Sequence, residues 1–193
     1  MRRLESARLN FGDFLLQIIK KLLTNERAAP VARVATPLPP LPVTEAHRVE
    51  HLSIAQVIPS YPAIFFDVDG VLHPYQTGSL GAVKYLTFLC EENPKIQLIM
   101  SSNWRETMDI DSYRREFPAI VVERTVGFTP VLKSRQEEVM AFVNHHGIRS
   151  FVCIDDDESL FSKDWLHLYL TDRATGMSKR DALNILNFFN EVC

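Results

Sequence analysis

Residues 63–72 read Ala-Ile-Phe-Phe-Asp-Val-Asp-Gly-Val-Leu, a short apolar run that ends in two carboxylates, Asp67 and Asp69, and a glycine. Because side chains alternate along a strand, this spacing puts both carboxylates on one side of the chain as it leaves the sheet. Divalent cations prefer oxygen ligands, and phosphoryl transfer needs a nucleophile and a proton donor. The pair therefore suits a metal-assisted phosphoryl site, although two solvated loop acids give the same pattern when no partners accompany them.

From Tyr61 onward the sequence alternates between runs typical of strands and runs typical of helices. It predicts strands at 63–67, 96–101, 119–122, 150–154 and 167–170, and helices at about 79–92, 109–116, 134–146 and 178–191. This alternation favours an α/β fold, with a doubly wound, Rossmann-like parallel sheet between two layers of helices. Such sheets bind ligands beyond the carboxyl ends of their strands, which is where partners of the acid pair are expected.

Two of the predicted helices begin with a capping box. Ser134 stands three residues before Glu137, and Ser178 stands three residues before Asp181. In each pair the serine can accept a hydrogen bond from the first turn while the acid bonds back to the serine. Gly147 follows the first of these helices, at the place where a left-handed residue commonly ends a helix.

A pair of hydroxyls and a pair of cations follow the acid pair along the chain. Ser101 and Ser102 come after the second predicted strand, where a hydroxyl could bond a phosphoryl oxygen or simply cap a turn. Lys133 and Arg135 flank the head of a capped helix, which already attracts anions. A cation there makes sense when an anion binds between it and the helix; two solvated surface charges are the alternative.

An acid cluster follows the fourth predicted strand. The four acids are Asp155, Asp156, Asp157 and Glu158. Adjacent carboxylates after a buried strand repel one another, and a cation would relieve the repulsion. A solvated acidic loop would give the same letters.

The order of these features resembles the haloacid dehalogenase (HAD) superfamily, whose doubly wound fold carries an acid pair, a hydroxyl, a cation and an acid cluster in this order. More narrowly, residues 61–193 resemble the compact, capless HAD domain found in RNA-repair proteins. The likeness rests on Phe-Asp-Val-Asp-Gly-Val-Leu-His-Pro, Ser-Ser-Asn-Trp-Arg, Arg-Gln-Glu-Glu-Val, Asp-Asp-Asp, and Thr-Asp ahead of Gly-Met-Ser. Val71 departs mildly from it, because many relatives have threonine at that position.

The resemblance implies a hydrolase: a magnesium-dependent phosphatase (a phosphomonoesterase) that works through an aspartyl-phosphate. Asp67 would be the nucleophile. Asp69 would protonate the leaving oxygen and then deprotonate the water that hydrolyses the intermediate. The Mg²⁺ ligands would be the Asp67 carboxylate, the Asp69 main-chain carbonyl and an acid from Asp155 and Asp156.

Two of the implied roles have two candidates each. The hydroxyl is Ser102 when the motif is aligned on Trp104, and Ser101 when it is aligned on the end of the apolar run; we favour Ser102. The cation is Lys133 in the commonest form of the superfamily motif and Arg135 in the Arg-x-Glu-Glu form of the narrower family. The sequence leaves that choice open.

The spacing of the motifs leaves no room for a separate cap domain. Only 31 residues separate Asp69 from Ser101, and 21 separate Lys133 from Asp155. A capless site is open, so it could accept phosphorylated nucleic-acid ends or other large substrates. Nucleic acid stays an unproven partner, since residues 61–193 carry 13 Lys and Arg against 19 Asp and Glu.

Aromatic residues near the motifs are candidates for the mouth of the site. They are His73, Tyr75 and Trp104. A ring at the mouth could stack on a base. Packing of Trp104 over the edge of the sheet is an equal alternative.

The chain before the motifs divides into an amphipathic helical segment, 1–28, and a proline-rich linker and connection, 29–60. Apolar residues recur at helical spacing within 11–23, but charges interrupt them, so neither a signal peptide nor a membrane span is predicted. The helix would pack on its own domain, mediate self-association or touch a membrane surface weakly. Residues 29–43 hold five prolines without a period, as in an extended linker.

The cysteines carry no motif. Cys90, Cys153 and Cys193 are scattered, and an odd number without a disulfide framework fits a reducing compartment, so a cytoplasmic location is expected. The alternative to an enzyme is a catalytically silent HAD-like domain that binds a partner through the helix at 11–23 and the linker.

We predict that deleting residues 1–43 leaves a soluble and active catalytic domain, because all four motifs lie within 61–193. Gel filtration and turnover of an aryl phosphate measure this. An insoluble or inactive truncation would instead assign the N-terminal helix to the core or to an obligate interface.

Overall fold

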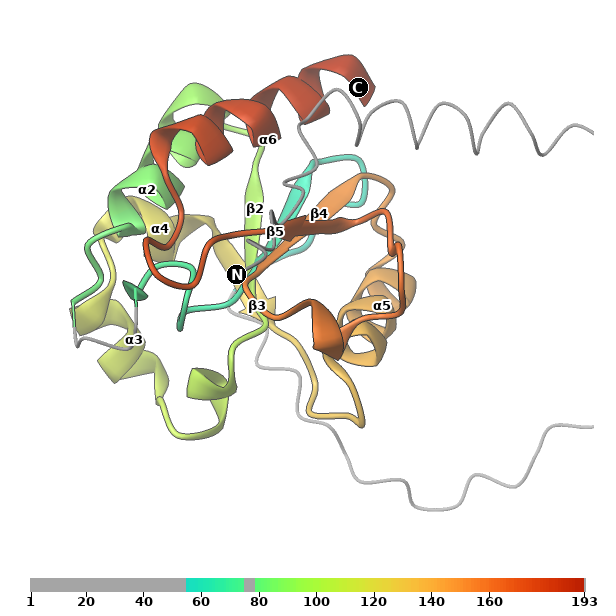
Figure 1. Cartoon of the computed structure of the whole chain (residues 1–193), viewed down its shortest axis with the longest axis horizontal. Coiled ribbons are helices and arrows are strands. Elements are labelled where there is room, and N and C mark those ends of the chain that lie inside the picture. The colour runs from blue at the N-terminus through green and yellow to red at the C-terminus, as the bar shows by residue number, and fades with distance from the viewer. Residues whose placement is uncertain (1–54, 75–78, 193) are drawn as a thin grey trace, which may run out of the picture. The chain divides into compact units, whose positions relative to one another are not determined.

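The computed structural model describes residues 55–74 and 79–192, which form a parallel sheet with helices on both faces (Figure 1). Its five strands, in the spatial order β3-β2-β1-β4-β5, are β1 (Ala63–Phe66), β2 (Gln97–Met100), β3 (Thr125–Phe128), β4 (Phe151–Asp155) and β5 (Leu168–Leu170). All pairings are parallel. The predicted doubly wound α/β fold is confirmed, and the strand that carries the acid pair is central.

The helices divide between the two faces of the sheet. They are α2 (Val83–Glu92), α3 (Ile110–Glu116), α4 (Ala119–Arg124), α5 (Arg135–His146) and α6 (Lys179–Val192), with 3₁₀ turns η2 (Asn103–Glu106) and η3 (Glu158–Leu160). Helix α2 packs on α4 and α6 on one face, and α5 lies on the opposite face (Figure 1). The two short turns come directly after β2 and β4, at the end of the sheet where ligands are expected.

Strand β1 is covered on both sides. Phe65 meets Phe142 of α5 and Phe151 of β4 edge-on, each at a ring-centroid distance of 5.7 Å. Phe66 points to the other face, where its ring lies 6.3 Å from that of Phe117. Because both faces are buried, β1 reads as a continuous apolar run rather than an alternating one.

The predicted strand at 119–122 is wrong. Those residues belong to helix α4, and the third strand is β3, a few residues later. The β-branched Ile-Val-Val run suggested a strand, but Pro118 precedes it and α4 packs on α2, so tertiary contacts override local preference. Strand β3 itself is hard to recognise because it contains Gly127 and pairs with β2 across a register shift.

Both predicted serine caps are confirmed, and the reciprocal bond from the acid is found at the head of α6. Ser134 Oγ accepts a hydrogen bond of 3.3 Å from the backbone N–H of Glu137, at the head of α5. At the head of α6, the Ser178 N–H donates to Asp181 Oδ2 at 2.7 Å, and the Asp181 N–H donates to Ser178 Oγ at 3.4 Å. Gly147 ends α5 in the left-handed region, with φ of 65°.

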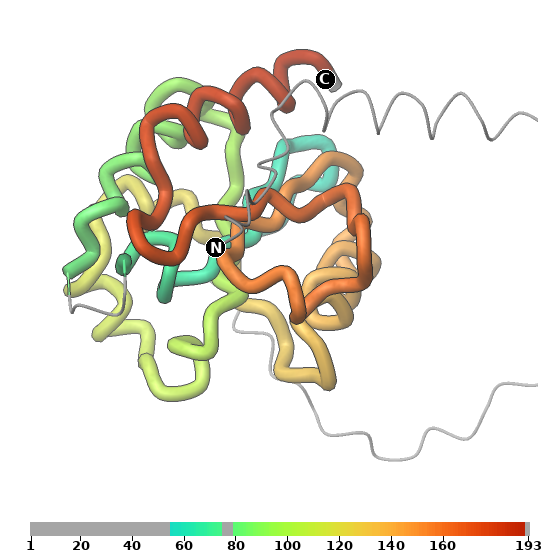
Figure 2. Tube along the Cα trace, viewed as in Figure 1, coloured from blue at the N-terminus to red at the C-terminus, as the bar shows by residue number. Residues whose placement is uncertain are grey.

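The loop after β5 supports the turn after β1. Thr171 Oγ1 donates to the Gly70 carbonyl at 3.0 Å, and the Met177 N–H donates to the Val71 carbonyl at 2.7 Å. Gly176 adopts φ of 64°, and a Cβ there would lie 2.7 Å from the Val71 oxygen, so only glycine fits. The chain trace in Figure 2 shows this red loop running beside the teal β1 turn.

The predicted helix at 11–23, the linker at 29–43 and Tyr75 lie outside the described residues. Among the helices of the described part, none is both long and apolar enough to cross a membrane. Within the described residues between β1 and β2, the one helix is α2, and they contain no cap domain.

Candidate active site

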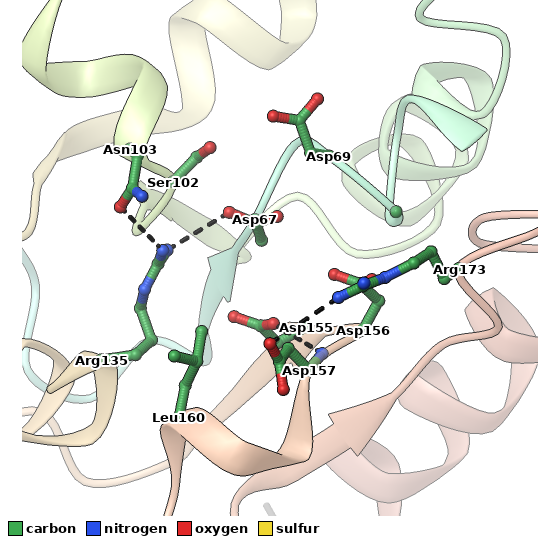
Figure 3. Close-up of a pocket in the computed structure, with 11 residues that line it drawn as sticks. Asp67, Asp69, Ser102, Asn103, Arg135, Asp155, Asp156, Asp157, Leu160 and Arg173 are labelled. Carbon is green, nitrogen blue, oxygen red and sulfur yellow. Dashed lines mark hydrogen bonds and ion pairs between the residues drawn. The ribbon is translucent and has the colours of Figure 1, made fainter. Parts of the chain in front are cut away.

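The strand-end residues predicted from the sequence surround a cavity of about 400 Å³ (Figure 3). Strand β1 and its turn, the turn after β2, the head of α5 and the segment after β4 all contribute to it. The lining residues are Asp67, Asp69, Gly70, Ser102, Asn103, Arg135, Asp155, Asp156, Asp157, Leu160 and Arg173. All four predicted motifs therefore contribute at least one named candidate to the cavity.

Asp67 lies at the centre of the site, directly after β1. Its N–H donates to the Ile154 carbonyl at 3.0 Å, which continues the ladder to β4, and the residue is only 7% exposed. Burial raises the pKa of Asp67 to about 6, while the Arg135 guanidinium and a hydrogen bond from Ser102 act in the opposite direction. The carboxylate is therefore mainly ionised above neutral pH, as a nucleophile requires.

Gly70 allows the two acidic segments to approach each other. It adopts φ of 75°, and a Cβ at this position would lie 2.3 Å from the Asp156 carboxyl carbon. No side chain larger than hydrogen can occupy that space without moving Asp156. The glycine after the acid pair is thus required both by the turn and by the neighbouring acid cluster.

The structure separates the two serine candidates. Ser102 lines the cavity and its hydroxyl acts to lower the pKa of Asp67, whereas Ser101 is fully buried and does not line the cavity. Ser102 Oγ also accepts a hydrogen bond of 3.4 Å from the Trp104 N–H and caps η2. The turn-capping and substrate-facing interpretations of this hydroxyl are therefore compatible.

The structure also separates the two cation candidates. Arg135 is buried, with Nη1 3.3 Å from Asp67 Oδ1 and Nη2 3.1 Å from Asn103 Oδ1. Lys133 is exposed and does not line the cavity. Of the two cation candidates, Arg135 is therefore the one that faces Asp67.

Arg135 belongs to a buried ionic network with Glu138 and Arg105. Glu138 Oε1 lies 2.8 Å from Arg105 Nη2, and Glu138 Oε2 lies 3.5 Å from Arg135 Nε. Arg105 also donates to the carbonyls of Ser101 and Ser102, at 2.9 and 2.6 Å, and so ties down the end of β2. We did not assign roles to Arg105 and Glu138 from the sequence, although both stand inside the quoted motifs; the i, i+3 spacing of Arg135 and Glu138 was the available signal.

Three acids come close enough to share a cation. One carboxylate oxygen from each of Asp67, Asp155 and Asp156 lies within 4.8 Å of the others. Asp155 is 1% exposed, and burial, followed by the charge of Asp67, raises its pKa to about 7. Within the described part of the chain, Asp155 Oδ2 is buried and has no hydrogen-bond partner. Buried carboxylate oxygens without partners fit a hard divalent cation well.

An arginine side chain, Arg173, lies at the rim of the acid cluster. Arg173, which is 62% exposed in its side chain, pairs with Asp156 and lies 3.7 Å from Asp157. Because Asp156 is also a member of the three-acid group, Arg173 partly neutralises that group from the solvent side. Its signal in the sequence was weak, since it stands alone in the loop after β5.

The Asp69 carboxylate points away from the three-acid group (Figure 3). Its Oδ1 lies 2.8 Å from His73 Nδ1, and its Oδ2 accepts a hydrogen bond of 3.0 Å from Trp104 Nε1. The Trp104 ring also meets the His73 ring edge-on at 5.8 Å. Trp104 thus contacts the acid pair itself, which neither the stacking nor the edge-packing interpretation anticipated.

Comparison with known proteins agrees with this geometry. The family described as the HAD domain in Swiss Army Knife RNA repair proteins matches residues 63–182, a range that contains every residue of the cavity. Neither a curated protein nor a solved structure matches the chain. The parallel sheet, the strand-end acids and the family match support a hydrolase of the HAD type. The chain belongs to the family of HAD domains found in Swiss Army Knife RNA repair proteins.

Proposed function

We propose that this chain is a Mg²⁺-dependent phosphomonoesterase that transfers a phosphoryl group first to Asp67 and then to water. The observation that carries the proposal is the position of Asp67, between the Arg135 guanidinium at 3.3 Å and the acids Asp155 and Asp156. In this position Asp67 would attack a phosphate with the Arg135 guanidinium on one side and a cation held by Asp155 and Asp156 on the other. Both positive charges would stabilise the equatorial oxygens of the phosphate.

Asp67 and Asp69 would divide the chemistry between them, with Asp67 as the nucleophile and Asp69 as the acid and base. Asp67 attacks phosphorus as the bond to the leaving oxygen breaks, and Asp69 gives its proton to that oxygen. Asp69, now ionised, takes a proton from a water molecule that attacks the phosphorus of the aspartyl-phosphate. The Asp67–phosphorus bond breaks, phosphate leaves, and both carboxyl groups return to their starting states.

Residues of the pocket would bind the phosphoryl oxygens during both steps. Ser102 can donate a hydroxyl hydrogen bond without adding negative charge, and Arg135 supplies two N–H groups on a buried guanidinium. Asp67, Asp155 and Asp156, with the Asp69 main-chain carbonyl, would hold Mg²⁺. When bound, Mg²⁺ would offset charge on the transferring group.

The open site and the occurrence of this family in RNA repair proteins indicate which substrates to test. We expect magnesium-dependent turnover of an aryl phosphate that EDTA abolishes, and we would next compare 5′- and 3′-phosphorylated RNA ends with nucleotides and phosphosugars. Acid quenching followed by peptide mass spectrometry should detect a phosphoryl group on the peptide that holds Asp67. Absence of both turnover and phosphopeptide across the panel would favour the silent binding module.

Arg135 and Lys133 can be compared by the same substitution. Arg135→Met should lower kcat/KM by roughly a hundredfold, since it removes a buried cation that faces the nucleophile. Lys133→Met should stay within about twofold of the wild type, because Lys133 is exposed outside the cavity. Steady-state kinetics on one aryl phosphate tests both, and loss of activity only in the Lys133 variant would reverse the assignment.

Asp155 should make the stability of the metal-free protein depend on pH. Its pKa is raised from 3.8 to about 7, so its favourable contribution is full below pH 3.8 and disappears as pH rises through about 7. At pH 8 without Mg²⁺, Asp155→Asn should therefore raise the free energy of unfolding by roughly 2–4 kcal/mol. The gain should shrink as the pH falls toward 4.

Urea denaturation with and without Mg²⁺ measures this effect. Mg²⁺ should stabilise the wild type at pH 8, less so below pH 6 where protons compete for the acids, and should not stabilise Asp155→Asn. Asp157→Asn is the matched control: Asp157 accepts hydrogen bonds from Ser159, which hold its pKa low, so its loss should not stabilise the protein. Equal effects of the two substitutions would contradict a metal role for Asp155.

A further inference from the structure

The Asp69 carboxylate is held at both of its oxygens, by side chains from two different segments. His73 Nδ1 lies 2.8 Å from Oδ1, and the Trp104 indole N–H donates to Oδ2 at 3.0 Å. The Asp69 side chain is 32% exposed, so without these two contacts it would be a solvated carboxylate free to change rotamer. Two fixed partners select one orientation, and in that orientation the carboxylate faces away from Asp155 and Asp156 (Figure 3).

Each of the two partners is itself fixed. His73 is 5% exposed and belongs to the tight turn after β1, in which its N–H donates to the Val68 carbonyl at 2.9 Å and its carbonyl accepts from the Gly70 N–H at 3.0 Å. Trp104 lies in η2, which Ser102 caps. The rings of His73 and Trp104 touch edge-on at 5.8 Å, so each supports the other.

We propose that His73 and Trp104 are positioning residues that hold Asp69 as the acid and base of the reaction, apart from the acids that would bind the cation. This inference rests on the proposed phosphatase function. Proton transfer needs the carboxyl group within hydrogen-bond reach of the leaving oxygen, and a misplaced acid loses much of its effect. The contacts with His73 and Trp104 also keep the second acid of the pair from joining Asp67, Asp155 and Asp156 as a competing ligand.

The role predicts a dependence on the leaving group that a purely structural role would not give. An acid that protonates the leaving oxygen matters most for an alkyl phosphate, whose leaving alkoxide is strongly basic, and least for dinitrophenyl phosphate, whose phenolate leaves unaided. Trp104→Phe keeps an aromatic ring at this position and removes the N–H. It should lower kcat/KM for glycerol phosphate about tenfold or more, and for dinitrophenyl phosphate by less than about twofold.

Three further variants complete the kinetic test. His73→Leu should show the same unequal loss as Trp104→Phe, whereas His73→Asn, whose amide N–H can reach the same oxygen, should recover most of the activity on the alkyl phosphate. Trp165→Phe is the matched control, because Trp165 stacks on Phe161 at 5.2 Å, outside the cavity. It should leave the ratio of the two rates unchanged. Equal losses on both substrates, or no loss on either, in Trp104→Phe and His73→Leu would overturn the inference.

A measurement without turnover tests the contact itself. The chain has two tryptophans, so a ¹H–¹⁵N spectrum has two indole N–H signals, which Trp104→Phe assigns. Asp69→Ala should move the Trp104 signal and speed its exchange with solvent, and should leave the Trp165 signal in place; an unmoved Trp104 signal would overturn the inference. Wild-type protein that turns over neither substrate would instead defeat the proposed function, and the positioning role with it.

Discussion

Asp67→Asn should reduce phosphatase turnover at least about a thousandfold, the largest effect on activity expected from any single change in this chain. The amide would keep the shape of the side chain but could not attack phosphorus. It would also give the cation one ligand fewer and leave the Arg135 guanidinium, now 3.3 Å from Asp67 Oδ1, with Glu138 as its remaining charged partner. Steady-state kinetics on an aryl phosphate with Mg²⁺ measures the loss, and the phosphopeptide should vanish with it.

A matched control separates loss of the nucleophile from loss of an acid in general. Asp111→Asn changes an exposed aspartate of α3 whose side chain pairs with Arg114 at the surface, and it should keep turnover within about twofold. Circular dichroism and urea unfolding of the Asp67 variant should still show one cooperative transition. If Asp67→Asn kept substantial turnover while folded, the covalent route through Asp67 would be wrong, whatever the identity of the substrate.

Glu138→Gln should lower the free energy of unfolding by roughly 3–5 kcal/mol, because breaking a buried ionic network leaves charge uncompensated. Glu138 is 5% exposed and lies between the guanidinium groups of Arg105 and Arg135, and its Oε1 also accepts the Leu132 N–H at 3.1 Å. Glutamine keeps the volume but cancels the charge, so two buried cations would repel each other. The melting temperature should fall by about 10 °C.

The control lies one residue away on the same helix. Glu137 is exposed, and Glu137→Gln should change the free energy of unfolding by no more than about 0.5 kcal/mol. Thermal and urea denaturation of the two variants, prepared identically, compare them directly. Similar losses in both would show that the helix, rather than the network between the two arginines, limits the stability.

The place of the candidate site in the fold was predictable because parallel strands bring their carboxyl ends to one edge. Asp67, Ser102 and Asp155 each follow a buried apolar run, and the alternation of strands and helices alone indicated that they meet. Ser134 marked the head of α5, where Lys133 and Arg135 were both candidates, and the structure was needed to distinguish them. Such patterns can be recognised in the sequence alone because each depends on only a few neighbouring residues.

Other parts depended on contacts that no local pattern contains. Helix α4 carries a β-branched run that favours a strand, and only its packing on α2 reveals it as a helix. Arg105 and Glu138 are charged residues in a turn and a helix, where a solvated position is the usual expectation. Their burial follows from the meeting of the end of β2 with the head of α5. The contact between Trp104 and Asp69 follows from the meeting of the turns after β2 and β1.

The support given to the β1 turn by residues 171–177 limits how early in synthesis the candidate site can assemble. Asp67 and Asp69 emerge early from the ribosome, yet Thr171 meets Gly70 from 101 positions later, and Met177 then bonds Val71. A nascent chain that lacks these residues holds its acid pair on an unsupported turn and lacks Arg173 beside Asp156. Assembly of the candidate site therefore requires the loop after β5 as well as the β1 turn itself.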